Sequence, residues 1–180
     1  MNVCVFCGSG TGVNPVYAEA TRDLAFLLSK NKCSLIYGGG NIGLMGILAD
    51  EMLKSSAQVI GVIPDFLVQL EVAHSGLSEL IIVTSMHERK KRMADLSDIF
   101  IALPGGIGTL DELAEILTWK QLGLIDNPIG LLNTNQYFNA LIQQWEKMVE
   151  DGFLKKGTLE SIQISTNPLQ LLTFLGVHTA

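Results

Sequence analysis

The sequence predicts an α/β, Rossmann-like three-layer fold with a central parallel sheet flanked by helices. Short apolar runs of strand length alternate with longer helical patterns along the whole chain. These runs are nearly continuously apolar, as is typical of parallel strands covered on both faces. Several of them end directly in glycine-rich turns. At 180 residues the chain has the length of one ordinary domain, so we expect residues 1–180 to form a single Rossmann-like nucleotide-binding domain.

Each expected strand is a short apolar run that stops at a glycine, a proline or a polar turn. The first runs into Gly8–Gly12, the second into Gly38–Gly40 and the fifth into Pro104–Thr109, whereas Pro64 stops the third. The expected strands are Asn2–Cys7, Ser34–Tyr37, Gln58–Ile63, Leu80–Thr84, Ile99–Leu103, Ile129–Leu132 and Ile162–Ile164. Sheets of this kind bind ligands at the carboxyl ends of their strands, which is where the glycines lie.

Each expected helix follows a strand and carries apolar residues at helical spacing. The first begins at Pro15, a residue favoured in the first turn, with Ala18, Leu24 and Leu28 at helical positions. The expected helices are Pro15–Lys30, Leu44–Lys54, Met86–Ser97, Leu110–Leu122, Gln136–Asp151 and Leu169–Leu175. The stretch Asp65–Ser78 is irregular and too long for a tight connection, and loops of that length are usually functional or mobile.

The composition excludes several classes of function. A net charge of −6 argues against a nucleic-acid partner, because phosphate backbones are held by clustered Lys and Arg. No apolar run reaches the roughly 18 residues of a membrane-spanning helix, and the first residues lack a basic leader region. We therefore expect no membrane association. With 48% hydrophobic residues the chain is apolar for a soluble monomer, which favours a homo-oligomer.

The three cysteines, Cys4, Cys7 and Cys33, are an odd number and a poor disulfide framework. Cys4 and Cys7 have CxxC spacing, but they lie within a strand pattern rather than at a helix start, which argues against a redox or zinc role. His74 and His87 have no metal-ligand spacing. We therefore expect reduced thiols, a cytoplasmic protein and no metal site.

The turn Gly38–Gly43 matches the GxGxxG pattern between a strand and a helix. Taken alone, it predicts a dinucleotide site, with Asp65 at about the right distance downstream. However, the match follows the second strand rather than the first, and Asp65 comes after Pro64 in a loop. The glycines, Gly39 and Gly40 among them, either contact a phosphate or ribose or only permit a tight turn, and both interpretations stay open.

The turn Pro104–Thr109 is more informative. Its three glycines let the backbone approach an anion, and the following helix contributes N–H groups and a partial positive charge. We expect Thr109 to cap that helix and to donate its hydroxyl to a phosphate. Asp111 and Glu112 then fall in the first turn. Interaction with the helix dipole explains Asp111, whereas a carboxylate at Glu112 beside an anion site favours a chemical role.

Basic residues open the helix expected at Met86–Ser97. Arg89 lies one turn into this helix at the carboxyl edge of the sheet, where it can pair bidentately with a carboxylate or phosphate. Lys90 and Lys91 turn away from the face of Arg89. The sequence contains no GxSxG elbow and no Ser-His-Asp ordering.

Three segments, Tyr37–Gly46, Met86–Lys90 and Pro104–Glu112, together closely resemble the LOG (Lonely Guy) family. The resemblance extends over nearly the whole chain, from Val3–Ser9 to Asp151–Phe153. Members of this family are phosphoribohydrolases that release a free cytokinin or related purine base from its riboside 5′-monophosphate. Many relatives carry the label "possible lysine decarboxylase".

The resemblance implies that Arg89 and Glu112 are the catalytic pair. It implies a phosphate cradle at Gly105, Gly106, Gly108 and Thr109. The other expected contacts to the nucleotide are Ser9, Gly39, Gly40, Glu71, Met86, Lys90 and Thr118. It further implies a homodimer with each site near the subunit interface, a nucleoside 5′-monophosphate as substrate, and no metal or organic cofactor.

The sequence departs from the family pattern at two places near the base. Many relatives have an Asp directly before Met86, where this chain has Thr84-Ser85, and Pro-Arg is frequent where it has Gln69-Leu70. The preferred base therefore stays open.

The chemistry agrees with these residues. Breaking a C1′–N9 bond develops positive charge on the ribose, which a carboxylate such as Glu112 can stabilise, or it can activate water. Arg89 can orient Glu112 and the ribose or phosphate. A decarboxylase would need a lysine Schiff base to pyridoxal phosphate, and no lysine lies at a strand end beside a phosphate loop. The other open classes are an NAD-type oxidoreductase and a nucleotide-binding module without catalysis.

Overall fold

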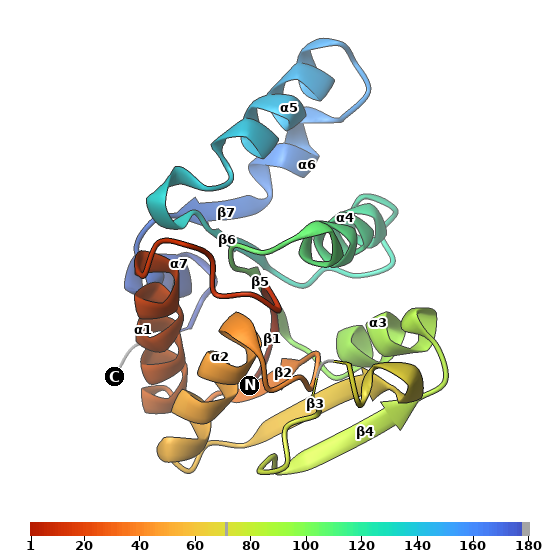
Figure 1. Ribbon diagram of the computed structural model, residues 1–180. Helices are drawn as coiled ribbons and strands as arrows, with labels where there is room; N and C mark the ends of the chain where they lie inside the picture. The colour runs from red at the N-terminus through yellow and green to blue at the C-terminus, as the bar shows by residue number, and fades with distance from the viewer. Residues whose placement is uncertain (71, 178–180) are drawn as a thin grey trace.

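The computed structural model describes residues 1–70 and 72–177, and within them the strands form one seven-stranded sheet (Figure 1). The strands are β1 (Asn2–Phe6), β2 (Ser34–Tyr37), β3 (Val59–Pro64), β4 (Glu79–Val83), β5 (Ile99–Ala102), β6 (Ile129–Leu132) and β7 (Ile162–Ser165). Their spatial order is β4-β3-β2-β1-β5-β6-β7, and all six pairings are parallel. The predicted fold class and all seven predicted strands are confirmed. The order reverses between β1 and β5, the kind of position at which open parallel sheets bind ligands.

Helices cover both faces of the sheet (Figure 1). They are α1 (Val16–Lys30), α2 (Gly43–Lys54), α3 (Met86–Asp95), α4 (Ile107–Gln121), α5 (Asn139–Glu150), α6 (Lys156–Glu160) and α7 (Pro168–Phe174), with 3₁₀ turns η1 (Asp65–Leu67) and η2 (Thr134–Gln136). Buried side chains of α1, α2 and α7 pack on one face, and those of α3 and α4 pack on the other. This places the amino ends of α2 and α4 beside the reversal point.

The core is built by strand alternation. In β1, Val3 and Val5 belong to the cluster on the side of α1, whereas Cys4 and Phe6 belong to the cluster on the side of α4. Because successive side chains of a strand point to opposite faces, an apolar run such as NVCVF supplies both clusters at once. This explains why the central strands read as continuously apolar.

Two helix starts differ from the prediction by three residues, whereas the other predicted starts agree to within one residue. Helix α4 begins at Ile107 with Gly106 as its N-cap, so the prediction that Thr109 caps it is wrong. Asp111 and Glu112 consequently lie in the second turn, and the first turn carries no acidic residue. Helix α5 begins at Asn139 rather than at the expected Gln136, where a positive φ of 59° does not fit a helix.

Helices α5 and α6 extend the molecule beyond the β7 edge (Figure 1). The sequence analysis did not predict α6, which is only five residues long. The apolar side chains of α5 pack against the core only in part, and none of its residues is fully buried. A cavity of about 270 Å³ lies among α4, α5, α6 and β7, lined largely by apolar side chains such as Leu117, Trp145 and Met148.

Candidate active site

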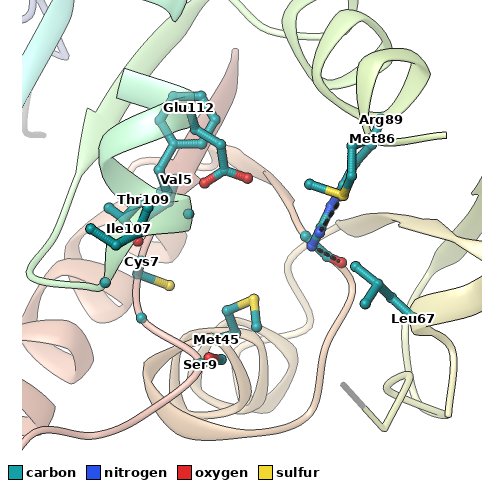
Figure 2. Close-up of a pocket in the computed structure, with 15 residues that line it drawn as sticks. Val5, Cys7, Ser9, Met45, Leu67, Met86, Arg89, Ile107, Thr109 and Glu112 are labelled. Atoms are coloured by element: carbon teal, nitrogen blue, oxygen red, sulfur yellow. Dashed lines mark hydrogen bonds between the residues drawn. The ribbon is translucent and has the colours of Figure 1, made fainter. Parts of the chain in front are cut away.

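A cavity of about 250 Å³ opens at the carboxyl ends of the central strands (Figure 2). Its walls come from the end of β1, the β2–α2 turn, the segment after β3, helix α3 and the first two turns of α4. The reversal between β1 and β5 therefore does form a pocket. The cavity brings together Arg89, Glu112 and Met86 with Ser9 and part of the turn before α4.

Arg89 enters this cavity from α3, with only 4% of its surface exposed. Its Nε donates to the carbonyl of Val62, 3.1 Å away, and its Nη2 donates to the carbonyl of Gly38 at 2.8 Å. These carbonyls belong to β3 and to the residue directly after β2. Two neighbouring strands thus hold the guanidinium in one orientation and satisfy part of its hydrogen-bonding capacity.

Gly38 provides the room that Arg89 requires. A Cβ atom at this position would overlap the guanidinium nitrogen Nη2. The first glycine of the GxGxxG match is therefore explained by the approach of an arginine.

Gly39 and Gly40 do not line the cavity; they hold the segment that follows β3. The carbonyl of Gly39 accepts a hydrogen bond from the His74 N–H at 3.0 Å, and Gly40 forms an isolated antiparallel bridge with Ala73. Asn41 donates in turn to the Val72 carbonyl at 2.9 Å. The turn after β2 is thereby connected to residues 72–74.

Glu112 faces Arg89 from the opposite wall of the cavity (Figure 2). Its side chain is half-buried and comes from the second turn of α4. Burial raises the pKa of the nearby Cys4 thiol well above its usual range, and the negative charge of Glu112 raises it further. A carboxylate from α4 and a guanidinium from α3 thus line the same small cavity.

The amino end of α4 forms one wall of the cavity. Gly106, Gly108 and Thr109 line the cavity there, together with Ser9 from the end of β1. No side chain in the described part of the chain caps this helix, so its first N–H groups are available to a ligand. Thr109 is only 3% exposed, so its hydroxyl reaches a ligand only at the cavity wall.

Gly105 lies beside this turn rather than in the cavity with Arg89. It borders a second cavity of about 300 Å³, which also contacts Ser9, Gly106, Tyr17 and Tyr137. A Cβ atom on Gly105 would overlap the Thr109 hydroxyl and approach the Gly8 nitrogen to 2.8 Å. Glycine is required here because the Thr109 side chain and the Gly8 backbone both lie against this position.

Lys90 and Thr118 lie outside the cavity of this chain. Lys90 pairs with Asp111 and Glu115 of α4, each at 3.1 Å. Burial disfavours its charged form, but the hydrogen bonds to these carboxylates outweigh burial and raise the pKa of Lys90. Thr118 is exposed, donates to the Ala114 carbonyl at 2.7 Å and borders the apolar cavity beside α5. Glu71, the remaining expected contact, lies outside the described residues.

Met45 and Leu67 also line the cavity, and the sequence analysis did not single them out. Met45 belongs to the glycine motif that carried the family resemblance, so its proximity could have been inferred. Leu67 lies in η1, within the irregular stretch after β3, and only the unusual length of that stretch pointed to it.

The departure from the family pattern before Met86 preserves the helix cap. Ser85 is the N-cap of α3, and its hydroxyl accepts from the Glu88 N–H at 3.1 Å. Thr84 donates to the Glu88 carboxylate through both its N–H and its hydroxyl, each at 2.8 Å, and these hydrogen bonds lower the pKa of Glu88. Serine and aspartate cap helices about equally well, so Ser85 can replace an Asp without loss of structure.

The described residues contain no group of three or more His, Cys, Asp or Glu side chains placed to hold a metal ion. Within the same residues, no helix is both long and apolar enough to cross a membrane.

Comparison with known proteins identifies the family. Residues 45–175 match a family model described as "Possible lysine decarboxylase". The chain is 48% identical over 176 residues to the cytokinin riboside 5′-monophosphate phosphoribohydrolase LOG5 of Arabidopsis thaliana, covering 98% of this chain and 77% of that protein. It is 43% identical over 170 residues to the probable cytokinin riboside 5′-monophosphate phosphoribohydrolase LOGL2 of Oryza sativa subsp. japonica, covering 94% of this chain and 70% of that protein.

Solved structures support the fold at lower identity. The molybdenum cofactor binding protein of Rippkaea orientalis superposes with a TM-score of 0.73 at 22% identity, over 97% of this chain and 94% of that one. The molybdenum cofactor carrier protein of Chlamydomonas reinhardtii gives 0.72 at 16% identity, over 98% and 96%. At these identities only the fold is shared. Through its sequence relatives, the chain belongs to the LOG family of cytokinin riboside 5′-monophosphate phosphoribohydrolases.

Proposed function

We propose that this protein hydrolyses the N-glycosidic bond of purine riboside 5′-monophosphates, including cytokinin nucleotides, to the free base and ribose 5-phosphate. The observation that carries this proposal is that Arg89 and Glu112 face each other across a cavity bounded by an uncapped helix N-terminus (Figure 2). Relatives that are 41–48% identical and are named for this reaction support it.

The reaction needs charge stabilisation on the ribose. The C1′–N9 bond breaks with its electron pair moving to the base, the oxygen of water bonds to C1′, and a proton from that water passes to the base. We assign Glu112 to stabilise the oxocarbenium-like ribose or to activate the water. Arg89, fixed by the Val62 and Gly38 carbonyls, orients Glu112 and the sugar phosphate.

The 5′-phosphate is assigned to the amino end of α4, beside Gly106, Gly108 and Thr109, with Ser9 on the other side. The helix N-terminus offers N–H donors and a partial positive charge to an anion. Binding energy from this remote group positions the sugar against Glu112. The contacts to the base are then assigned to Met86, Met45 and Leu67, which also line the cavity.

Lysine decarboxylation, which the family label mentions, does not fit the cavity. That chemistry requires a lysine that forms a Schiff base with pyridoxal phosphate. None of the described lysines lines the cavity, and Lys90 is directed to two carboxylates of α4.

The decisive experiment incubates the purified protein with AMP, with N6-prenylated AMP and with adenosine. Free base together with ribose 5-phosphate from either nucleotide supports the proposal. We expect kcat/KM for adenosine to be far below that for AMP, because adenosine lacks the group assigned to the helix N-terminus. Equal cleavage of AMP and adenosine would overturn the phosphate assignment. No base release from either nucleotide would overturn the reaction.

We further propose that the protein is a homodimer with α4 near the two-fold axis. Supporting this, Leu122 and Leu124, which directly follow α4, are 65% and 67% exposed, and a largely apolar cavity lies between α4 and α5. A second copy can cover such a surface. Thr118, exposed and remote from its own cavity, would then be available to the site of the partner.

We also propose a cytoplasmic location. Cys4, Cys7 and Cys33 are all buried and none forms a disulfide, which is typical of a reducing compartment. Cell fractionation with an antibody against the protein tests this proposal, and recovery from an oxidising compartment would contradict it.

A further inference from the structure

Tyr137 is connected directly to the turn before α4. Its hydroxyl donates a hydrogen bond of 2.6 Å to the carbonyl oxygen of Gly105, across 32 positions of sequence. Tyr137 directly follows η2, in the segment that joins β6 to α5, and it carries no role in the family resemblance described above. This hydrogen bond therefore ties a segment outside the recognised motifs to the candidate phosphate turn.

The hydrogen bond fixes the orientation of one peptide group. The Gly105–Gly106 peptide is trans, as are all described peptide bonds. In a planar trans peptide, the carbonyl of one residue and the N–H of the next point in opposite directions. Because the Gly105 carbonyl points to Tyr137, the Gly106 N–H points away from Tyr137.

Gly106 lies between two cavities. One is the second cavity, which Tyr137 and Tyr17 line, and the other is the cavity that contains Arg89 and Glu112. An N–H that points away from Tyr137 points away from a residue that lines the second cavity and not the first. It joins the N–H groups of the first turn of α4, which begins one residue later.

The ring of Tyr137 is itself held in place. It packs edge-on against Tyr17, with ring centroids 5.8 Å apart, and edge-on against Phe138, with centroids 5.0 Å apart. Phe138 is 1% exposed and anchors this pair to the core. The hydroxyl is therefore presented at a defined place, although Tyr137 as a whole is 44% exposed.

The Tyr137 hydrogen bond restrains a peptide that lies between two glycines. Gly105 has no side chain to restrict its backbone, and glycine peptides rotate more readily than others. Without an external partner, the Gly105–Gly106 peptide can turn its N–H out of the cavity. An N–H donor that is already oriented binds an anion more tightly than one that the ligand must first order.

We infer that Tyr137 is a positioning residue for 5′-phosphate recognition: its hydroxyl orients the Gly105–Gly106 peptide so that the Gly106 N–H faces the anion. This inference rests on the proposed function for its substrate, although the effect on phosphate binding stands without turnover. Tyr137 does not line the cavity assigned to the substrate. It selects for substrates that carry a phosphate.

The test compares Tyr137→Phe with Tyr17→Phe. Both changes remove one phenolic oxygen and keep the ring, but the Tyr17 hydroxyl has no hydrogen-bond partner among the described residues. We measure kcat/KM for AMP and for adenosine, and the dissociation constant of ribose 5-phosphate by titration calorimetry. Thermal unfolding controls for the fold.

Tyr137→Phe is expected to lower kcat/KM for AMP and the affinity for ribose 5-phosphate by about fivefold to tenfold, as expected for one hydrogen bond. Its rate with adenosine and all values for Tyr17→Phe should stay as in the wild type. An equal loss with AMP and adenosine, or unchanged ribose 5-phosphate affinity, would overturn the inference. A wild type that binds ribose 5-phosphate but cleaves no nucleotide would reject the proposed reaction, and the binding comparison would still decide the role of Tyr137.

Discussion

The guanidinium Nη2 of Arg89 lies 2.8 Å from the carbonyl oxygen of Gly38, a residue 51 positions earlier in the chain. This hydrogen bond joins helix α3 to the turn after β2 and sets the orientation of the arginine in the cavity. It also explains the glycine at position 38 by space rather than by contact with a ligand. The arginine and the glycine motif are therefore parts of one arrangement.

Gly38→Ala is expected to displace Arg89 and to reduce base release from AMP by at least about tenfold, because a misplaced group at a reacting centre is costly. Affinity for ribose 5-phosphate should fall less, since the amino end of α4 is unchanged. Gly157→Ala in α6 is the matched control, because a Cβ atom there meets nothing within 4 Å. Normal turnover in Gly38→Ala would show that the position of Arg89 is not critical.

Glu112→Gln is expected to abolish base release while nucleotide binding and the fold remain largely intact. Glutamine keeps the volume of the side chain and suits a helix, so the loss of unfolding free energy should be small. Turnover, AMP affinity and thermal unfolding are measured on the same preparation. Near-normal turnover in this variant would remove Glu112 from the catalytic assignment.

How far the sequence predicts this structure depends on the range of the interactions involved. The seven strands follow from local apolar runs, and the cavity follows from the general behaviour of parallel sheets. The start of α4 was missed by three residues because Thr109 is a good cap by composition, whereas Gly106 actually takes that position. Local sequence preference could not show that the Thr109 side chain instead packs against Gly105.

The sequence motifs predicted which residues lie at the cavity, but not the contacts between distant segments that orient their side chains. Arg89 and Glu112 both line the cavity, but the carbonyls that hold Arg89 belong to Val62 on β3 and to Gly38 directly after β2, both far away in sequence. Lys90 belongs to the same motif as Arg89, yet its direction is decided by Asp111 and Glu115 on another helix. No local pattern contains that information.

Lys90→Met is expected to lower the free energy of unfolding by about 1 kcal/mol near pH 8, since the ammonium is mostly buried between two carboxylates. The folded-state pKa of Lys90 is raised above its ordinary 10.5, so this contribution is present below that value and disappears as pH rises through the raised pKa. The difference from wild type should therefore shrink in denaturant titrations at strongly alkaline pH.

Lys156→Met, which removes an exposed pair with Glu160, is the control and should change stability little at any pH. If Lys90→Met instead unfolds like the wild type but loses turnover, Lys90 serves the nucleotide and the structural interpretation is contradicted.

His74 should contribute to substrate affinity by holding the segment after β3. Its Nδ1 accepts from the Gly76 N–H at 3.0 Å, so the proton lies on Nε2 and is donated to Asp50, 3.1 Å away. His74→Ala removes both hydrogen bonds and is expected to cost about 1–3 kcal/mol of stability. It should raise KM for AMP more than it lowers kcat, because Leu67 on the same segment lines the cavity.

Asp50→Asn keeps a carbonyl oxygen that can accept from His74, so it should stay close to the wild type, whereas Asp50→Ala should shift KM in the direction of His74→Ala. Steady-state kinetics with AMP distinguish these variants. If His74→Ala loses stability without any change in KM, the residue supports the fold but not the site.

The assembly of the protein can be tested through the apolar surface at the end of α4. Light scattering of dilute protein should give twice the chain mass of 19.5 kDa. Leu122, which is 65% exposed, is the side chain to change, and Leu122→Glu should yield monomers because a charge would be buried against the second copy. Phe26→Glu on α1 is the matched control, since Phe26 is 61% exposed on a helix that packs on the other face of the sheet.

If each site lies close to the partner, the monomeric variant should also lose base release. A wild-type monomer with full activity would refute both the dimer and the shared site.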